Sequence, residues 1–315
     1  MTSATMASTG EGETMTRETI TRGTTLYGAA TPSRMTVEAP ASTRAVMLIA
    51  QHELRTALRS RMVPAFAALF TILAIAISLA GLGASGQLLV QGFTRTAVSL
   101  MSLALYLLPL LGTLLGAAAI GGEDGGAELL LAQPISRAQA LLGRTVGLAA
   151  ALGIISGLGF GAAAIVVVLG AGAEGLTGYA LVALGVTAVG IVGVGTGVLV
   201  GVLTRRRVAA VAWALALWFG AAVLYDLVAI GVLQIAGSGQ PGPWLVALLS
   251  LNPIDGVRAV ALVELGADVL LGPTGAALQR MFGTNGGMAV VIGSLAMWVV
   301  APIAIAVRCY ARRDF

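Results

Sequence analysis

Long apolar stretches alternate with short polar segments from residue 62 to the end of the chain. Six of these stretches can cross a membrane, because a helix needs about 20 apolar residues to span the hydrocarbon core. They are Met62–Ala84, Val98–Ile120, Val146–Gly170, Tyr179–Leu203, Val208–Leu233 and Gly287–Val307. The pattern predicts an all-α integral membrane protein in which residues 62–315 form a domain of six transmembrane helices.

The segment before the first predicted span has a different pattern. In residues 44–61, apolar and polar positions recur at helical spacing, which predicts an amphipathic helix lying in the membrane interface. The apolar face holds Met47, Ala50, Leu54 and Leu58, and the polar stripe holds Gln51, Arg55 and Arg59. A plain extension of the first span into the cytoplasm is the alternative. Residues 1–43 are rich in Thr, Ser and Gly and predict a disordered cytoplasmic tail, unless translation starts at a later methionine.

Charge is scarce in this chain. It is 57% hydrophobic and only 10% charged, whereas soluble domains carry about 25% charged residues. The net charge is +4, and every basic residue is an arginine. Because the arginines flank the apolar stretches, we interpret them as topology signals and expect no binding of nucleic acid.

The arginines also alternate between the two sides of the predicted bundle. With Arg17, Arg22 and Arg34 of the predicted tail set aside, twelve fall in segments on the same side as the N-terminus, and three fall on the opposite side. The first set is Arg44, Arg55, Arg59, Arg61, Arg137, Arg144, Arg205, Arg206, Arg207, Arg308, Arg312 and Arg313, and the second is Arg95, Arg258 and Arg280. Since cytoplasmic loops are rich in arginine, we expect both termini in the cytoplasm. The run at 205–207 is either a plain anchor or a contact for anionic lipid or a partner protein.

Glycines recur every four residues in two of the predicted spans. Small residues at this spacing let helix backbones approach closely in lipid. The third span holds Gly153, Gly157 and Gly161, and the fourth holds Gly193, Gly197 and Gly201. Both runs predict tight helix packing, although glycine is also frequent throughout the chain.

Residues for catalysis or nucleotide binding are missing from the sequence. A single cysteine, Cys309, and a single histidine, His52, exclude a cysteine cluster or a multi-histidine metal site. The chain has no lysine and hence no P-loop, and the G-x-G-x-x-G spacing at 81–86 lacks the surrounding strand and helix of a dinucleotide site. We therefore expect no catalytic residue, cofactor or metal, and any ATP must be bound by another polypeptide.

Asp226 is the only acidic residue well inside a predicted span. Ionisable groups at membrane depth usually face the protein interior or a water-filled path, so a proton or substrate role is one interpretation. The other is a residue about two turns from the outward end of its helix, hydrogen-bonded to its neighbours.

The segment 234–286, between the fifth and sixth spans, is long and is expected outside the cytoplasm. It contains Trp244–Leu251, which is too short to cross the membrane. Asn252-Pro253 follows and predicts a turn that ends a helix. We expect a second amphipathic helix from about Gly256 to Leu271. Loops of this length are usually functional or form a small folded cap.

The cytoplasmic segment after the second span has the most distinctive sequence. Glycine pairs end the span, a short helix would cover residues 127–133, and Pro134 would break it. Ser136 is placed to cap the next helix, which continues into the third span. A short helix held between two spans suits a partner that moves both spans together.

This segment resembles the signature of ABC-2-type transporter permeases. The matching residues are Glu123, Gly126, Glu128, Leu130, Leu131, Pro134 and Arg137, followed by Gly143-Arg144. Asp124 and Gly125 depart from the family, which often has a basic residue there, and Gly-Ala replaces its Gly-Thr. Glu53-Leu54, Arg59 and Arg61 are similar to the helix that opens these permeases. The resemblance covers about residues 45–315.

Within the family, the chain most resembles the branch that serves maturation of nitrous oxide reductase. Asn252, Pro253, Asp255 and Arg258 carry that similarity, together with Gly272–Ala276 and Gln279–Gly283. Related permeases share N-P-x-D-x-x-R, so this narrower likeness is less specific.

The resemblance implies a fold like that of type V ABC exporters, located in the inner membrane. It implies two permease copies and two copies of a cytoplasmic ATPase subunit docked on Glu123–Arg137 and the helix at 44–61. In the nitrous oxide reductase branch it implies a periplasmic accessory protein and assembly of a copper site. Export of a lipid, drug or glycan, ion-coupled transport through Asp226, and a purely structural anchor are the alternatives.

Overall fold

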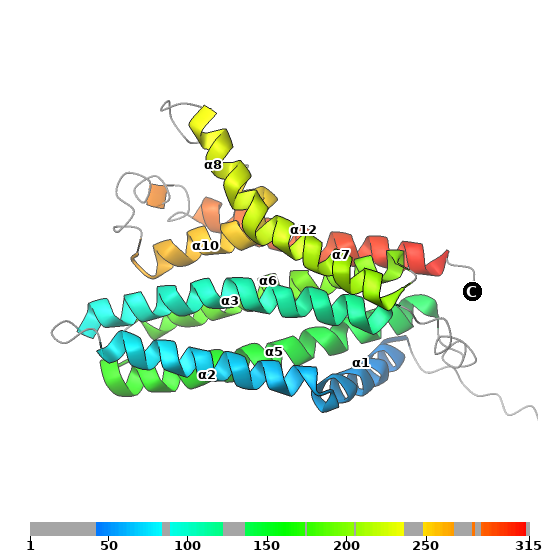
Figure 1. The fold of residues 1–315 in the computed structure, drawn as a ribbon, viewed down its shortest axis with the longest axis horizontal. Coiled ribbons are helices and arrows are strands. Elements are labelled where there is room, and N and C mark those ends of the chain that lie inside the picture. Colours follow the sequence, from blue (N-terminus) through cyan, green and yellow to red (C-terminus); the bar gives the residue numbers. More distant parts are fainter. Residues whose placement is uncertain are drawn as a thin grey trace, which may run out of the picture. The chain divides into compact units, whose positions relative to one another are not determined.

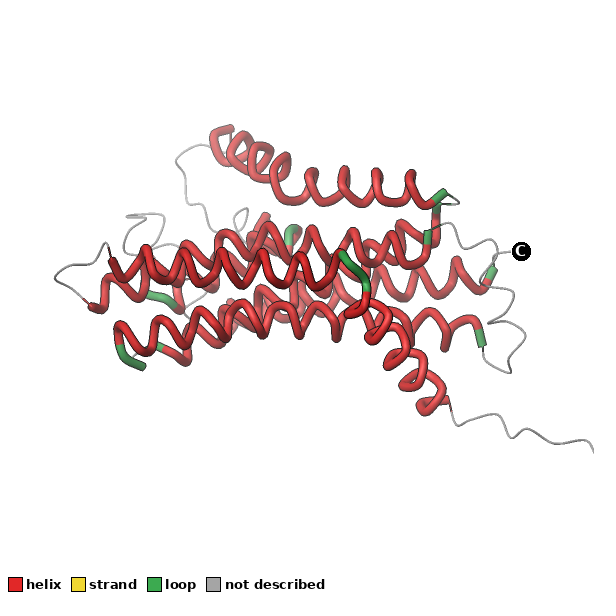
Figure 2. Tube along the Cα trace, turned by 60° about the horizontal axis from the view of Figure 1, so that its bottom comes forward, coloured by secondary structure: helices red, strands yellow, loops and turns green. Residues whose placement is uncertain are grey.

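The structure is a computed structural model that describes residues 42–83, 89–121, 136–173, 175–204, 206–235, 248–267, 279–280 and 285–312. The chain divides into two units, Met1–Ala39 and Pro40–Phe315. The first unit, which holds most of the predicted tail, lies outside the described residues. Figure 2 shows that the regular elements of the described part are helices, with no strand among them.

The helices follow the predicted order along the chain (Figure 1). They are α1 (Ser42–Arg59), α2 (Met62–Gly83), α3 (Leu89–Ile120), α5 (Arg137–Ala171), α6 (Leu176–Leu203), α7 (Arg207–Phe219), the π-helical turn η1 (Gly220–Leu224), α8 (Tyr225–Ile235), α10 (Pro253–Glu264) and α12 (Asn285–Ala311). Among the described residues, six continuous helical stretches are long and apolar enough to cross a membrane. They are Met62–Gly83, Thr94–Ile120, Arg137–Gly170, Leu176–Leu203, Arg207–Val232 and Gly287–Ala311. The six predicted spans are therefore confirmed.

The largest difference from the predicted boundaries is at the third span. Its helix begins at Arg137 instead of Val146, because Ser136 forms the predicted N-cap. The Ser136 hydroxyl accepts a hydrogen bond from the backbone N–H of Gln139 at 3.2 Å. The Gln139 side-chain oxygen in turn accepts from the backbone N–H of Ser136 at 3.0 Å. This reciprocal capping satisfies two backbone donors and stabilises an early helix start.

Helix α1 is separate from the first span. The chain turns at Ser60, whose hydroxyl donates to the carbonyl of Ala57 and accepts from the backbone N–H of Val63. Helix α1 packs along α5 and turns Ala50 and Leu54 toward the protein, whereas Met47 and Leu58 are exposed. Half of the predicted apolar face therefore packs against the protein, and the other half is exposed.

Helices α3 and α6 form the centre of the bundle and pack against each other (Figure 1). In the most apolar part of α6, 61% of residues are buried, against 17% in α2. Glycines allow this close approach, because a methyl group at Gly193 would lie 2.6 Å from the carbonyl oxygen of Pro109 in α3. One at Gly197 would collide with the Thr113 carbonyl. Tight packing is confirmed for the glycine run of the fourth span.

The glycine run of the third span behaves differently. A methyl group added at Gly153, Gly157 or Gly161 would have no described neighbour within 4 Å. The prediction of tight packing through these three glycines is therefore wrong within one copy of the chain. The helix uses other glycines for its contacts, since Gly143 and Gly147 face α1, and Gly159 faces Phe70 of α2.

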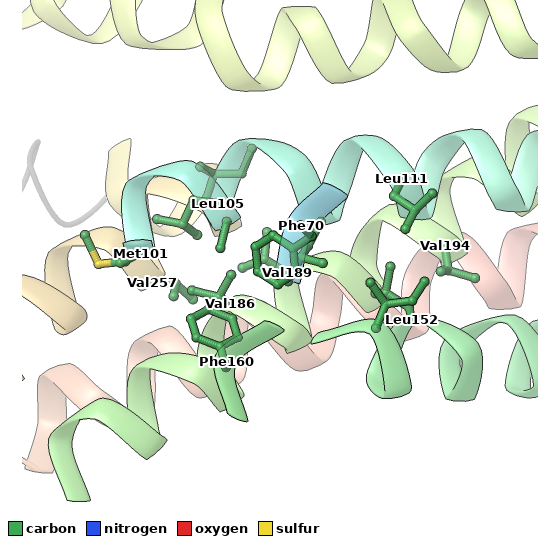
Figure 3. Close-up of a cluster of buried hydrophobic side chains, with 14 of the residues drawn as sticks. Phe70, Met101, Leu105, Leu111, Leu152, Phe160, Val186, Val189, Val194 and Val257 are labelled. Atoms are coloured by element: carbon green, nitrogen blue, oxygen red, sulfur yellow. The ribbon is translucent and has the colours of Figure 1, made fainter. Parts of the chain in front are cut away.

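Aromatic and aliphatic side chains fill the space between α2, α3, α5 and α6 (Figure 3). Phe160 of α5 lies edge-on to Phe70 of α2 and to Tyr179 of α6, with ring centroids 5.8 and 5.9 Å apart. The Tyr179 hydroxyl donates to the carbonyl of Phe160 at 2.8 Å. These contacts fix α2 and α6 on opposite sides of the same α5 side chain.

The segment between the fifth and sixth spans carries a largely buried helix that begins earlier than predicted. Helix α10 begins at Pro253, before the predicted Gly256, and ends at Glu264. Asn252 caps it and Pro253 occupies its first turn, where a missing N–H costs nothing. The turn therefore starts a helix as well as ending the short one at 248–251. Most of α10 is buried against the bundle, and the predicted end at Leu271 lies outside the described residues.

Candidate functional site

The predicted ATPase-coupling segment has only its end in the described part of the chain. Glu123, Gly126, Glu128, Leu130, Leu131 and Pro134 lie outside the described residues. Arg137 is half-buried in the first turn of α5. The segment therefore connects Gly121, at the end of the second span, to the capped start of a helix that continues through the third.

The predicted opening helix contacts that same α5. The Arg144 guanidinium donates to the Glu53 carboxylate at 3.3 Å, and both side chains are largely buried. Gly147 lets the backbones approach, because a methyl group there would lie 2.5 Å from the carbonyl oxygen of Ala50. Leu54 is half-buried beside this contact, whereas Arg59 is exposed at the end of α1. The structure thus joins Glu53 and Leu54 to α5 and leaves Arg59 free of that contact.

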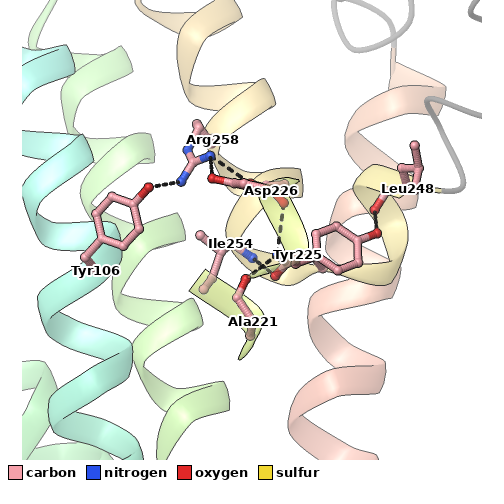
Figure 4. A network of polar contacts seen from close by, with 9 residues as sticks. Tyr106, Ala221, Tyr225, Asp226, Leu248, Ile254 and Arg258 are labelled. Atoms are coloured by element: carbon pink, nitrogen blue, oxygen red, sulfur yellow. Dashed lines mark hydrogen bonds and ion pairs between the residues drawn. The ribbon is translucent and has the colours of Figure 1, made fainter. Parts of the chain in front are cut away.

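At the other end of the bundle, Asn252 links α10 to the fifth span, and Figure 4 shows its partners Ile254 and Ala221 in this region. Its side-chain oxygen accepts from the backbone N–H of Ile254 at 3.1 Å. Its amide donates to the carbonyl of Ala221 at 2.8 Å and to the Asp255 carboxylate at 2.9 Å. Ala221 belongs to the π-helical turn η1. Asn252 therefore joins the start of α10 to the fifth span.

The centre of this polar cluster is Arg258. Its guanidinium donates to Asp255 at 2.9 Å and to Asp226 at 3.2 Å. It also donates to the Tyr106 hydroxyl at 3.1 Å and lies 5.6 Å from the centre of that ring. Figure 4 shows that these groups come from α3, α8 and α10. We call Tyr106, Asp226, Asn252, Asp255 and Arg258 the polar cluster.

The π-helical turn explains how Asp226 reaches this cluster. An extra residue in a helical turn rotates the residues that follow by about 100° relative to an uninterrupted α-helix. Asp226 comes two positions after η1, in the first turn of α8. The turn therefore directs an acidic side chain of the fifth span toward Arg258.

One arginine in the polar cluster faces two carboxylates. Burial raises the pKa of Asp255 from its ordinary value to about 6, and the nearby Asp226 charge adds to this, while Arg258 opposes it. Near neutral pH the Asp255 carboxyl is therefore close to its pKa, so a modest fall in pH adds a proton to the cluster. It can bind the three helices together or respond to a proton, but it has no nucleophile paired with a base.

Three aromatic residues near the polar cluster make hydrogen bonds that the sequence did not predict. Tyr106 lies in the middle of an apolar span, and its carbonyl accepts from the Trp218 indole at 3.0 Å. The Tyr225 hydroxyl donates to the carbonyl of Leu248 at 2.6 Å. A tyrosine or tryptophan in an apolar stretch is ordinary in membrane helices, so only the fold reveals that these are partners.

Among the described residues, no group of three or more His, Cys, Asp or Glu side chains is placed to hold a metal ion. His52 is exposed on α1 and Cys309 is half-buried on α12, so neither contributes to the polar cluster.

The sequence of the chain is similar to one family of known proteins and to two individual relatives within it. The family model described as ABC-2 family transporter protein matches residues 47–315. The "Probable ABC transporter permease protein NosY" of Stutzerimonas stutzeri is 36% identical over 242 residues, covering 70% of this chain and 87% of the relative. The protein of the same name in Pseudomonas aeruginosa is 32% identical over 297 residues, covering 85% of this chain and 98% of the relative.

Proposed function

Because the chain belongs to the ABC-2 transporter family as a multi-pass permease of the inner membrane, we propose that a separate ATPase subunit drives it. In this proposal, two copies of the chain pair in the membrane, and two ATPase copies dock on their cytoplasmic side. Residues 123–137 and the exposed side of α1 form the docking surface. The permease transmits the work of ATP binding and hydrolysis, and the hydrolysis itself occurs in the partner.

The continuity of α5 is the observation that carries this proposal. Helix α5 has 35 residues, from the capped end of the coupling segment to the far side of the third span. Helix α1 is fastened to it through the Glu53–Arg144 ion pair and the glycine contact at Gly147. A force on the coupling segment or on α1 therefore acts on one long, rigid element that crosses the membrane.

Co-purification in mild detergent tests this proposal. We expect the chain to carry an ATPase subunit with it when the two are expressed together. A Leu131→Arg change in the coupling segment should abolish co-purification, because it replaces an apolar contact by a charge. The control is Arg95→Gln, which changes an exposed arginine on α3 far from the coupling segment in the sequence. Retention of the ATPase by the Leu131 variant would contradict the proposed docking surface.

The substrate side of the proposal concerns the polar cluster. We propose that the work reaches the outward segment at α10 and serves maturation of a periplasmic copper enzyme of the nitrous oxide reductase type, with a periplasmic accessory protein. Support comes from the NosY relatives, which match most of the chain, and from the anchoring of α10 to the fifth span by Asn252. Export of a lipid, drug or glycan is the competing function.

Complementation separates these two functions. The gene for the NosY relative would be removed from Stutzerimonas stutzeri and replaced by the gene for this chain with its own ATPase. Restored reduction of nitrous oxide supports the maturation role. If the proteins are made and assemble but nitrous oxide is not reduced, the maturation role is wrong and the export function is favoured.

Ion-coupled transport through Asp226 receives less support from the geometry. The carboxylate is paired with Arg258 and belongs to a cluster that joins three helices. A proton carrier must change its charge during the cycle, and here such a change would leave the arginine with one carboxylate fewer. The arrangement favours a structural part for Asp226.

A further inference from the structure

A cavity of 810 Å³ lies beneath α1, between that helix, α3, α5 and the first residue of α7. Its volume falls within the range of small-molecule sites, about 300–1,000 Å³. Most of its wall is apolar and is made of alanine and leucine side chains. These include Leu48 of α1, Leu115 and Ala118 of α3, and Leu148 of α5. The polar cluster and the coupling segment do not account for this cavity.

The cavity lies where four spans reach the same membrane surface. Met62 is the first residue of the first span, and Arg207 is the first residue of the fifth. Leu115 and Ala118 stand in the last two turns of the second span, and Ala140 stands in the first turn of the third. The cavity is therefore at the depth where lipid headgroups meet acyl chains, on the side that carries the chain's excess of arginine.

The charge of the cavity is unbalanced. Among the described residues that line it there are two arginines, Arg144 and Arg207, and one carboxylate, Glu53. Arg144 is paired with Glu53 at 3.3 Å. Arg207 is exposed at the rim and leaves a net positive charge beside the apolar wall. Apolar walls below a cationic rim are complementary to a phospholipid with a negatively charged headgroup.

We propose that this cavity binds one anionic glycerophospholipid from the leaflet on the arginine-rich side. The phosphate group contacts Arg207, and an acyl chain lies along Leu115 and Leu148. Residues of α1, α3 and α5 all line the cavity, so the bound lipid contacts α1 together with the helices beside it and holds α1 against the bundle. The proposal does not depend on which cargo or enzyme the permease serves.

Vesicles of equal parts phosphatidylcholine and phosphatidylglycerol provide the test. The full chain is reconstituted in them, extracted in mild detergent, and weighed by native mass spectrometry to identify the lipid retained. We expect one retained phosphatidylglycerol per chain. Arg207→Gln should weaken its retention relative to phosphatidylcholine by about fivefold, the effect of one arginine at an anionic surface. Ala118→Phe should reduce retention of either lipid by filling the apolar wall.

Arg206→Gln is the matched control. It removes the same charge from the neighbouring position, and Arg206 is exposed but does not line the cavity, so retention should equal that of the unchanged chain. Equal effects of the Arg206 and Arg207 changes would overturn the proposal, because they would show that residues 205–207 attract anionic lipid only through their general surface charge. Equal retention of both lipids would overturn it as well. Loss of the signal when inorganic phosphate is added would assign the cavity to a soluble anion. Undiminished retention in the Ala118 variant would place the retained lipid outside the cavity and overturn the proposal.

Discussion

Arg258 is the residue on which the outward part of the fold depends. A guanidinium has five donors in a rigid fork and stays charged at any physiological pH. Here it donates to groups on three different helices, including the largely buried carboxylate of Asp255 and the half-buried carboxylate of Asp226. An arginine in this position cannot be exchanged for another polar residue without leaving charges in the interior.

We expect Arg258→Gln to lower the stability of the chain by about 2 kcal/mol, because it leaves Asp226 and Asp255 as neighbouring carboxylates without a counter-charge. Thermal unfolding in mild detergent, followed by tryptophan fluorescence, measures this. A second change, Asp226→Asn, should restore part of the loss by removing one of the two charges. Arg95→Gln, at an exposed arginine of α3, should have no effect. Equal unfolding temperatures for the Arg258 and Arg95 variants would contradict the role given to Arg258.

The Asp255 carboxyl should make stability depend on pH. Its pKa is raised from 3.8 to about 6, mainly by burial, so the folded chain holds this proton more tightly than the unfolded chain. Its contribution to stability is therefore fully present below about pH 4 and is lost as pH rises through 6. We expect a lower unfolding temperature at pH 7 than at pH 5, and a smaller difference in Asp255→Asn. Glu264→Gln, which changes an exposed carboxylate on the same helix, should keep the full difference.

The sequence singled out Asp226, Asp255 and Arg258, but as separate features of a span and a loop. Their meeting depends on the π-helical turn, whose residues are Gly220–Leu224. Glycine, alanine, valine and leucine are equally suited to an ordinary α-helix, so no pattern indicates the extra residue. Tyr106 was missed for a related reason, since nothing distinguishes it from an apolar residue until Arg258 is placed beside its hydroxyl.

At the scale of elements, the contact between α3 and α6 organises the bundle. Two helices pack at backbone distance only where both surfaces lack bulky side chains. Gly112 and Gly116 on α3 face the backbone of α6, and Gly193 and Gly197 on α6 face the backbone of α3. The neighbouring atoms are main-chain carbonyls, which cannot turn aside as a flexible side chain can.

Gly193→Ala should therefore destabilise the chain by about 2 kcal/mol through overpacking, even though alanine favours helix formation. Gly157→Ala offers a matched control, because a methyl group there meets no described neighbour within 4 Å. That change should be neutral or stabilise the helix by up to about 1 kcal/mol. Unfolding temperatures of the two variants decide the matter, and a ranking with Gly157→Ala as the less stable would refute the packing described for α3 and α6.

The elements themselves were largely predictable, since a run of apolar residues long enough for the membrane has few other structures available. Differences arose where local hydrogen bonds set the boundary. The Ser136 capping box moved the third helix to an earlier start, and Asn252-Pro253 began α10 where only a helix end was expected. The two glycine runs had the same spacing, so the sequence could not tell that one packs within the chain and the other does not.

At the scale of the whole molecule, the contact between α1 and α5 lies at one end of the bundle and the polar cluster lies toward the other. Helix α5 begins beside α1 at the arginine-rich end, where Arg144 pairs with Glu53. Helix α10 and Arg258 lie toward the other end of the bundle, because Asp226, which pairs with Arg258, is close to the end of the fifth span. If an ATPase acts on residues 123–137, as proposed, its force passes directly into the third span, because α5 continues from that segment through the span.

Orientation in the membrane is the prediction on which this path depends. Arginine strongly resists transfer across the bilayer, so the side with twelve arginines should be the cytoplasm and the side with three should face outward. Cys309 is the single cysteine of the chain, and Cys309→Ala gives a background for labelling. Introduced by Ser136→Cys or Arg59→Cys, a thiol should react with a membrane-impermeant maleimide only after spheroplasts are permeabilised. Introduced by Ala173→Cys or Arg95→Cys, at exposed positions on the other side, it should react in intact spheroplasts. Labelling of position 136 from outside would place the coupling segment beyond the reach of a cytoplasmic ATPase.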